Sequence, residues 1–273
     1  MATAAHSPAL GVDIGGTGIK GAVVDTETGE LTSDRIKLPT PPGGEPDGIV
    51  ATVVEIVEQL GAGLSADAPV GVCFPAVVKH GRTMSAANVS DRWIGLEAET
   101  LFEKALGRDI QFVNDADAAG YAEVRYGAAK DRGGLIMLTT LGTGIGTALI
   151  YNGVLVPNTE LGHLELRGKD AELRAAYSAK ERRNLSWRAW AKQLQRYYAT
   201  LERLFSPDLF IVGGGVSKNY EEFFPLLELN TEIVPAALRN NAGILGAAAL
   251  AVPGDPVEPP APIAPPASIA PMT

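Results

Sequence analysis

The stretch Gly11-Val-Asp-Ile-Gly-Gly-Thr-Gly-Ile-Lys-Gly21 decides how the first part of the chain folds. Gly16, Gly18 and Gly21 satisfy the glycine pattern of dinucleotide-binding proteins, in which a helix must follow the glycines. Here residues 19–25 form a β-branched run that ends in a glycine-containing turn, and this pattern predicts a strand. The glycines therefore join two strands, and the sequence indicates a glycine hairpin rather than a nicotinamide or flavin site.

The same hairpin occurs again, with Gly142 in the place of Gly16. The second copy reads Leu141-Gly-Thr-Gly-Ile-Gly146, and in both copies an apolar strand, a turn and another strand follow the glycines. The third strand of the first copy, expected within residues 31–38, has an imperfect alternation. We expect two similar halves whose hairpins present backbone N–H groups to an anion across one cleft. The alternative is that both are ordinary tight turns.

Composition limits the class of protein. The chain has 273 residues, of which 46% are hydrophobic, and this length is close to that at which one core divides into two. Helix and strand patterns alternate, which predicts an α/β fold. The net charge of −9 argues against a nucleic-acid-binding protein, and the single cysteine, Cys73, excludes an intrachain disulfide and a cysteine-rich zinc site. The sequence has neither an evident signal peptide nor a membrane-spanning run, so we expect a cytoplasmic protein with no membrane partner.

Apolar periodicity predicts the remaining helices and strands. The expected helices are 47–60, with Asp47 as the N-cap, and then 96–106, 116–126, 186–205 and 242–251. The expected strands are 70–74, 110–113, 135–141, 145–151, 154–156 and 209–212. Eight of the residues 253–273 are proline, so this segment is expected to be a disordered tail.

Five motifs occur in a fixed order, and together they resemble the sugar kinases of the ROK (repressor, open reading frame, kinase) family. They are Asp13-Ile-Gly-Gly-Thr-Gly-Ile-Lys20, Asn114-Asp115-Ala-Asp-Ala-Ala, Leu141-Gly-Thr-Gly-Ile-Gly146, Glu160-Leu-Gly-His163 and Ile211-Val-Gly-Gly-Gly-Val-Ser217. The resemblance covers about residues 10–251. Three further segments are similar to the polyphosphate glucokinase branch, which includes polyphosphate/ATP glucomannokinases: Leu185-Ser-Trp187, residues 204–215 and residues 238–243.

The resemblance implies an α/β, two-lobed, actin-like (ribonuclease H-like, ASKHA) sugar kinase fold with a central cleft. The N-terminal lobe would comprise residues 10–114 and the C-terminal lobe residues 115–252, with the last helix able to pack back on the N-terminal lobe. The implied reaction is Mg²⁺-dependent transfer of a phosphoryl group from inorganic polyphosphate, ATP or both to the 6-hydroxyl of glucose, with mannose as a further candidate. A homodimer is also suggested by the family.

Asp115 is implied as the catalytic base that accepts the proton of the sugar hydroxyl. Its position at the start of a helix favours an anion, although an aspartate there also suits a plain N-cap. Asp117 is expected to face elsewhere, as an acid of the first helical turn. The implied sugar ligands are Asn88, Asn114, Asp115, Glu160, His163 and a further glutamate, Glu172, with Glu165 as its rival.

The implied donor site combines both hairpins with a third glycine run. Its residues are Asp13, Gly15, Gly16, Thr17, Gly18, Lys20, Thr140, Gly142, Thr143, Gly144, Gly213, Gly214 and Gly215. Asp13 can hold Mg²⁺ directly or through water, or it can simply cap a turn. Lys20 can contact a phosphate or lie on a solvated strand face. Many family members carry a cysteine-rich zinc site after the Gly-His pair, but residues 167–181 contain no cysteine, so we expect no structural zinc.

The donor is the open question. Residues 174–203 contain eight basic and two acidic side chains, which can guide a polyanion or can be a solvated helix face. Two alternatives to a polyphosphate-using enzyme are a strictly ATP-dependent ROK sugar kinase and a sugar-responsive, non-catalytic regulator. The second is disfavoured because only about ten residues precede the first strand, too few for a helix-turn-helix domain. A non-catalytic actin-like ATPase would need neither Asn114-Asp115 nor Glu160-x-x-His163.

Overall fold

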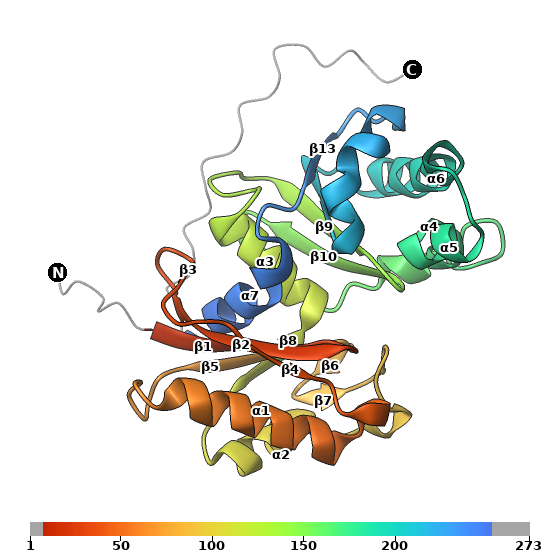
Figure 1. Cartoon of the computed structure of the whole chain (residues 1–273). Coiled ribbons are helices and arrows are strands. Elements are labelled where there is room, and N and C mark those ends of the chain that lie inside the picture. Colours follow the sequence, from red (N-terminus) through yellow and green to blue (C-terminus); the bar gives the residue numbers. More distant parts are fainter. Residues whose placement is uncertain (1–7, 253–273) are drawn as a thin grey trace.

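The computed structural model describes residues 8–252, which form two sheets with two helices between them (Figure 1). In the first sheet the strand order is β3-β2-β1-β5-β8, with β4 also paired to β2. In the second sheet the order is β11-β10-β9-β12-β13. If β4 is set aside, both sheets have the same strand order when their strands are numbered along the chain: 3-2-1-4-5. The repeat in the sequence is therefore also a repeat of topology. The α/β class and the two-lobed arrangement predicted from the sequence are confirmed.

We call the first sheet with its outer helices the N lobe and the second sheet with its outer helices the C lobe. The strands of the N-lobe sheet are β1 (Pro8–Ile14), β2 (Gly18–Asp25), β3 (Glu30–Leu31), β4 (Ile36–Pro39), β5 (Val70–Phe74) and β8 (Gln111–Asn114). Those of the C-lobe sheet are β9 (Leu135–Leu141), β10 (Ile145–Tyr151), β11 (Val154–Val156), β12 (Leu209–Gly213) and β13 (Glu232–Pro235). A separate hairpin joins β6 (Val78–Lys79) to β7 (Arg82–Thr83).

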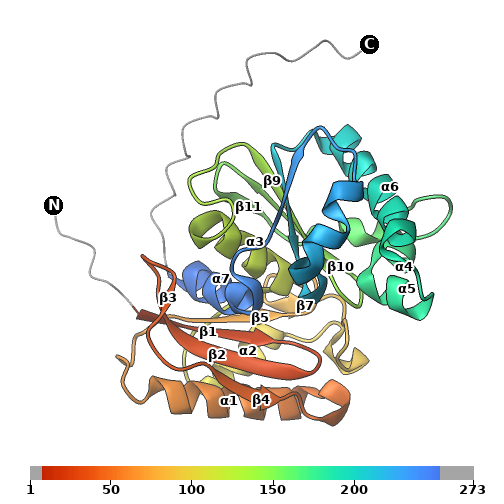
Figure 2. The same cartoon turned by 45° about the horizontal axis from the view of Figure 1, so that its top comes forward.

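Helices cover both faces of each sheet. The outer helices of the N lobe are α1 (Pro46–Gly61) and α2 (Ala98–Leu106), and those of the C lobe are α4 (Glu172–Ala175), α5 (Tyr177–Arg182) and α6 (Trp187–Phe205). Between the sheets lie α3 (Asp115–Tyr126) and α7 (Ala242–Ala251), which pack against each other (Figure 2). No helix within residues 8–252 is both long and apolar enough to cross a bilayer.

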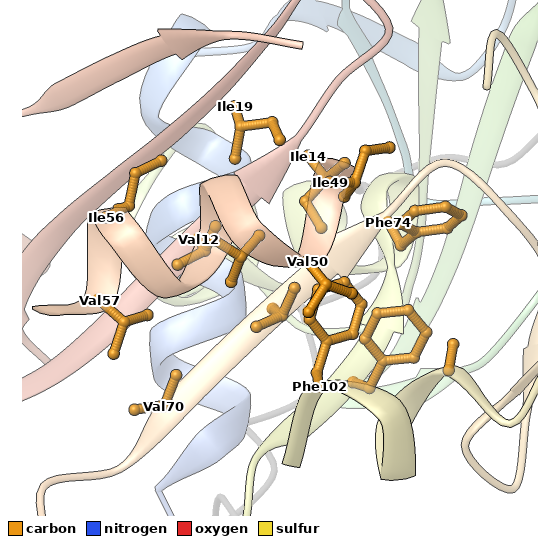
Figure 3. Close-up of a cluster of buried hydrophobic side chains, with 14 of the residues drawn as sticks. Val12, Ile14, Ile19, Ile49, Val50, Ile56, Val57, Val70, Phe74 and Phe102 are labelled. Atoms are coloured by element: carbon orange, nitrogen blue, oxygen red, sulfur yellow. The ribbon is translucent and has the colours of Figure 1, made fainter. Parts of the chain in front are cut away.

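The alternation of side chains along β1 explains how the strand serves both faces of its sheet. Leu10, Val12 and Ile14 join the core beneath α1 and α2, which Figure 3 shows for Val12 and Ile14. The intervening residues, Gly11 and Asp13, lie on the opposite face, against α7. The carboxylate of Asp13 is thereby placed between the two lobes.

Glycines let α7 approach the strands directly. A Cβ atom on Gly11 would lie 2.0 Å from the carbonyl oxygen of Ile244, and one on Gly71 would lie 1.9 Å from that of Ala247. A Cβ atom on Gly246 would lie 1.8 Å from the carbonyl oxygen of Ala118, so the contact between α3 and α7 is equally close. The last helix thus packs on N-lobe strands.

Glu123, which is fully buried near the end of α3, fastens the segment that leads into α7. Its carboxylate accepts hydrogen bonds from the backbone N–H groups of Ala128 (2.8 Å), Ala237 (3.1 Å) and Leu238 (2.8 Å). A buried carboxylate needs such partners to offset its lost hydration. Glu123 therefore helps to set the position of α7, and no sequence pattern pointed to this role.

The sequence located most elements within two residues, but three details differ. The expected third strand is divided into β3 and β4, because residues 32–35 leave the sheet between them. Asp47 lies inside α1, whose N-cap is Glu45, because Pro46 takes the first helical position that suits proline. Five short strands and α-helices were not anticipated: β6, β7, β13, α4 and α5. The expected disordered tail, 253–273, lies outside the described residues.

Candidate active site

The side chain of Asn114, not that of Asp115, caps helix α3. Its Oδ1 accepts hydrogen bonds from the N–H groups of Ala116 (2.8 Å) and Asp117 (3.0 Å), and its Nδ2 donates to the carbonyl of Ala76 (2.9 Å). Capping was the alternative role considered for Asp115. Within residues 8–252, the Asp115 carboxylate accepts one hydrogen bond, from the adjacent Ala116 N–H (2.8 Å). Most of its accepting capacity is therefore available to a substrate.

The environment of Asp115 raises its pKa to about 7. Burial is the largest cause, and the negative charge of Asp13 is the next. The Ala116 hydrogen bond opposes the shift, whereas Glu160 and Asp117 add to it. A carboxylate with a pKa near neutrality is well matched to accept a proton from an alcohol in a transition state. The charge effects also show that carboxylates from both lobes meet at Asp115.

Asp13 forms an ion pair with Lys20, its cross-strand neighbour in the β1–β2 ladder. Lys20 Nζ lies 3.0 Å from Asp13 Oδ2. Cys73 packs beside the carboxylate, with its Sγ 3.7 Å from Asp13 Oδ1, and burial together with Asp13 and Asp115 raises the pKa of this thiol. The sequence offered a phosphate contact or a solvated position for Lys20, and the ion pair with Asp13 was foreseen by neither interpretation.

The first glycine hairpin contacts the predicted sugar ligand Asn88. The hairpin is closed by a hydrogen bond from Gly15 N–H to Gly18 C=O (3.1 Å), and the hydroxyl of Thr40 donates to the Gly15 carbonyl. A Cβ atom on Gly16 would lie only 2.8 Å from the Cβ of Asn88, which is itself exposed and in the left-handed region at φ 62°. The hairpin and Asn88 are thus immediate neighbours.

The second hairpin gathers the remaining predicted donor residues. Gly142 N–H donates to Gly144 C=O (3.0 Å), and Ser178 on α5 donates to the carbonyls of Gly142 (3.0 Å) and Thr143 (2.6 Å). The end of β12 lies alongside, because Gly213 pairs with Thr140. Gly214 has φ 81° and its missing Cβ would lie 2.5 Å from Leu141 O. The glycine run 213–215 and the second hairpin are therefore in direct contact.

An acidic cluster surrounds His163. Its Nδ1 lies 3.0 Å from Asp170 Oδ2 and 3.9 Å from Glu172 Oε1, and its Nε2 lies 3.8 Å from Glu160 Oε2. The hydrogen bond with Asp170 is the largest cause that raises the pKa of His163, and Glu172 and Glu160 add to it. Burial raises the pKa of Glu160, which His163 lowers. Asp170 belongs to this cluster, although the sequence analysis did not select it.

Of the two rival glutamates, Glu172 lies in the cluster. Its Oε2 also accepts a hydrogen bond from Ile145 N–H (3.1 Å) directly after the second hairpin. It therefore connects the predicted sugar ligands to the predicted donor loop. Glu165 is exposed and pairs with Asp170 only through an isolated backbone bridge.

Asp117 is buried, although we expected an ordinary acid of the first turn. It is 2% exposed, and its Oδ2 accepts a hydrogen bond from Asn158 N–H (2.7 Å). Burial raises its pKa to about 7. The side chain of Asn158 in turn bonds to both the N–H and the C=O of Val78, each at 2.7 Å. Asp117 and Asn158 thus form a polar connection between α3 and β6, two residues before Glu160.

The carboxylates of the site suit a Mg²⁺ ion whose other ligands come mainly from a substrate; they do not form a complete metal site by themselves. Within residues 8–252, no group of three or more His, Cys, Asp or Glu side chains is arranged to hold a metal ion. Mg²⁺ commonly uses one or two protein carboxylates and completes its shell with phosphate oxygens and water. Asp13 beside the first hairpin, with Asp115 close enough to be affected by its charge, provides such a partial shell.

Comparison with known proteins agrees with this geometry. The sequence matches the model of the ROK family over residues 9–176. It is 50% identical over 244 residues to a polyphosphate glucokinase of Mycobacterium tuberculosis, an alignment that covers 89% of this chain and 91% of that protein. Two solved structures are also similar. The inorganic polyphosphate/ATP-glucomannokinase of Arthrobacter sp. strain KM has a TM-score of 0.84 and 51% identity, with coverage of 89% and 97%. The ROK family glucokinase of Streptomyces griseus, in complex with glucose and AMPPNP, has a TM-score of 0.74 and 26% identity, with coverage of 89% and 99%.

Proposed function

This chain belongs to the ROK family, and from that premise we propose that it is a glucokinase that uses inorganic polyphosphate, ATP or both as phosphoryl donor. The similar mycobacterial protein is named a polyphosphate glucokinase, and the similar Arthrobacter enzyme a polyphosphate/ATP-glucomannokinase. Both alignments cover about nine-tenths of this chain. The reaction class is therefore phosphotransfer to an alcohol acceptor. Mannose as a second acceptor, a cytoplasmic location and a homodimer remain predictions.

The observation that carries the proposal is the state of Asp115. This carboxylate has a pKa of about 7, and the charges of Asp13 and Glu160 contribute to that value. Asn114 caps helix α3, so Asp115 is not needed as the N-cap. In the proposed step, Asp115 accepts the proton of the 6-hydroxyl of glucose while that oxygen forms a bond to the terminal phosphorus of the donor. The bond from phosphorus to the bridging oxygen breaks, and ADP or a polyphosphate shortened by one unit leaves with the electron pair. Phosphoryl transfer of this kind depends mainly on positioning and charge stabilisation.

The sugar would be held by the polar groups on either side of Asp115. We assign Asn88, Asn114, Glu160, His163 and Glu172 to its hydroxyls, since amides and carboxylates can each pair with adjacent hydroxyls. Asp170 would act by orienting His163 through their 3.0 Å contact. A site built from such groups discriminates strongly against analogues that lack a hydroxyl, because its own polar atoms would then lose their partners.

The donor phosphates would lie at the two hairpins. We assign them to the backbone N–H groups of residues 15–18 and 142–144, with Thr17, Thr140 and Thr143 as hydroxyl donors and Lys20 as a nearby charge. Glycine at these positions lets a phosphate approach the backbone closely. The run Gly213–Gly215, next to Thr140, would accommodate the sugar and base of ATP when a nucleotide is the donor. The same hairpins suit a polyphosphate end, so the geometry is compatible with both donors.

We assign Mg²⁺ to Asp13, directly or through water. When bound, the ion would neutralise charge on the donor phosphates. The pairing of Asp13 with Lys20 fixes the carboxylate beside the first hairpin.

Replacement of Asp115 tests the role of this residue. We expect Asp115→Asn to lower the rate of glucose 6-phosphate formation by about 10²–10⁴-fold, because the amide cannot accept the proton. Glucose binding, measured by calorimetry, should persist because the size and polarity of the side chain are preserved. Asp109→Asn, at an exposed carboxylate, is the matched control and should behave as the unaltered protein. Normal turnover in Asp115→Asn would exclude the proposed base.

A further inference from the structure

A groove lined by four arginines lies away from Asp115, on the outer side of the C lobe. We call it the arginine groove and define it by Arg167, Arg174, Arg196 and Arg203; its volume is about 600 Å³. It runs between α6 and the segment that carries α4, and Figure 1 shows these helices together on one side of the molecule. Helix α6 packs on the face of the C-lobe sheet opposite to α3. The groove is therefore distinct from the hairpins and from Asp115.

The four arginines of the arginine groove have no ion-pair partner in the part of the chain that the structure describes. Its other lining residues are leucine, alanine, glutamine and threonine, so no carboxylate of residues 8–252 lines it. None of the ion pairs found within residues 8–252 includes any of the four arginines, and Arg196 forms a 3.2 Å hydrogen bond with the neutral side chain of Gln193. The whole chain has a net charge of −9. Four uncompensated guanidinium groups in one hollow of an acidic protein favour an anionic ligand.

The basic surface continues from the arginine groove towards the second glycine hairpin. A neighbouring hollow of about 470 Å³ shares Arg174 and adds Lys169, Arg182 and Arg183. Arg182 is the last residue of α5, and Ser178 in the first turn of that helix is hydrogen-bonded to the second hairpin. The helical rise between Ser178 and Arg182 is only about 6 Å. Basic side chains therefore begin one short helix from the predicted donor site and extend through both hollows.

The shape and chemistry of this surface fit a long, flexible chain of phosphates. The two hollows share Arg174 and together present seven basic side chains, so they can bind phosphates at several points along one chain. Single-stranded nucleic acid would need aromatic side chains on which bases can stack, and among the described residues no aromatic side chain lines either hollow. Inorganic polyphosphate has charge along its whole length and no base, and guanidinium groups bind phosphate oxygens in a bidentate manner.

We propose that the arginine groove anchors the distal part of a long inorganic polyphosphate chain whose terminal phosphate lies at Asp115. This inference rests on the proposed function and extends it to a second binding site for the same donor. Anchoring raises the effective concentration of the chain end at the hairpins, so it lowers the KM for long chains. It leaves kcat unchanged, because the groove does not touch the reacting atoms. Donors too short to reach the groove gain nothing from it.

The test compares donors of different length in a paired set of variants. The groove variant carries Arg196→Gln and Arg203→Gln, and the control carries Arg188→Gln and Lys192→Gln on the same helix, where both side chains line a different hollow. In the groove variant we expect the KM for long-chain polyphosphate to rise about tenfold, with kcat and the KM values for tripolyphosphate and ATP unchanged. In the control variant all these values should stay close to those of the unaltered protein.

Several outcomes would overturn the inference. One is an equal loss in both variants, which would indicate only a general effect of net charge; another is an equal loss with all three donors. A third is an unchanged KM for long chains in the groove variant. Calorimetric titration with long-chain polyphosphate, and with single-stranded RNA of similar charge, measures the affinity of each polyanion for the protein in the absence of turnover. RNA binding as tight as that of polyphosphate would refute the assigned ligand. Turnover with ATP but with no polyphosphate of any length would refute this inference and leave the proposed glucokinase activity intact, whereas no turnover with either donor would refute the proposed function itself.

Discussion

The raised pKa of Asp115 has a consequence for stability that is separate from catalysis. In the unfolded chain the pKa of this carboxyl group is expected near its ordinary value of 3.8, whereas in the folded protein it is about 7. The folded state therefore binds the proton more tightly than the unfolded state. The charged carboxylate weakens the fold progressively as the pH rises from about 4 to about 7, and the effect is constant above that range. The variant Asp115→Asn removes this titration.

The size of the effect follows from the shift. Each unit of pKa difference corresponds to about 1.4 kcal/mol, so the charged carboxylate lowers the free energy of unfolding by about 2 kcal/mol at pH 5 and about 4 kcal/mol at pH 8. The asparagine side chain of the variant differs from aspartate in other ways, such as its hydrogen bond to Ala116, but such differences do not depend on pH. The diagnostic quantity is therefore the change in relative stability between the two pH values, about 2–3 kcal/mol.

The assay is urea denaturation of both proteins, without ligand, at pH 5 and pH 8. We expect the free energy of unfolding of Asp115→Asn, relative to the unaltered protein, to be higher at pH 8 than at pH 5 by that amount. Asp109→Asn, at an exposed carboxylate, controls for the loss of one negative charge. The same relative stability at both pH values would refute the reasoning, because it would mean that Asp115 keeps an ordinary pKa in the fold.

Three further predictions concern the catalytic base, the packing of α7 and the connection between the lobes. With saturating donor, kcat/KM for glucose should fall by up to about tenfold per pH unit once the pH drops below the pKa of Asp115, because burial raises that pKa and the carboxylate must be ionised; a profile that stays flat down to pH 5 would contradict this. Gly246→Ala should lower the free energy of unfolding by about 1–3 kcal/mol in urea denaturation, because the added methyl group would lie 1.8 Å from the carbonyl oxygen of Ala118. The control Gly61→Ala, whose methyl group would have no atom within 4 Å, should be neutral or stabilising. Asn158→Gly keeps the left-handed backbone but removes both side-chain hydrogen bonds to Val78 in β6. Steady-state kinetics should show that the KM for glucose rises about tenfold, because Glu160 is then less well positioned. An unchanged KM would exclude a role for Asn158 in positioning Glu160.

Sequence patterns predicted those parts of the fold that depend on neighbours in the chain. The alternation in β1 and β9, the two glycine hairpins and the helix stop signals are all local, and the strands 70–74, 135–141, 145–151 and 154–156 were located to the residue. The short strands β3, β4 and β13 were misjudged or missed. These three strands have two to four residues each, too few to show a period, and they lie at sheet edges, whereas the three-residue β11 is marked by the Asn152-Gly153 turn that joins it to β10.

The candidate site shows the same division. Motifs selected Asp115, Glu160 and His163 as site residues. They did not show that the side chain capping helix α3 is that of Asn114 and not that of Asp115. The pairing of Lys20 with Asp13 follows from the register of β1 and β2, which one sequence does not specify. Asp117 and Asn158 could not be linked from the sequence, because they meet only when α3 packs beside the loop before Glu160. The nearest signal was the spacing of Asn158 two residues before the Glu-x-x-His motif.

The most direct test of the account is product formation by the purified protein with glucose, Mg²⁺ and long-chain polyphosphate in the absence of any nucleotide. Phosphorus NMR should detect a sugar phosphate monoester, and carbon NMR should place it on C6. The same mixture with Asp115→Asn should yield almost none over the same time. If the protein forms glucose 6-phosphate neither from polyphosphate nor, in a parallel reaction, from ATP, the result would contradict the central claim that this protein is a glucokinase.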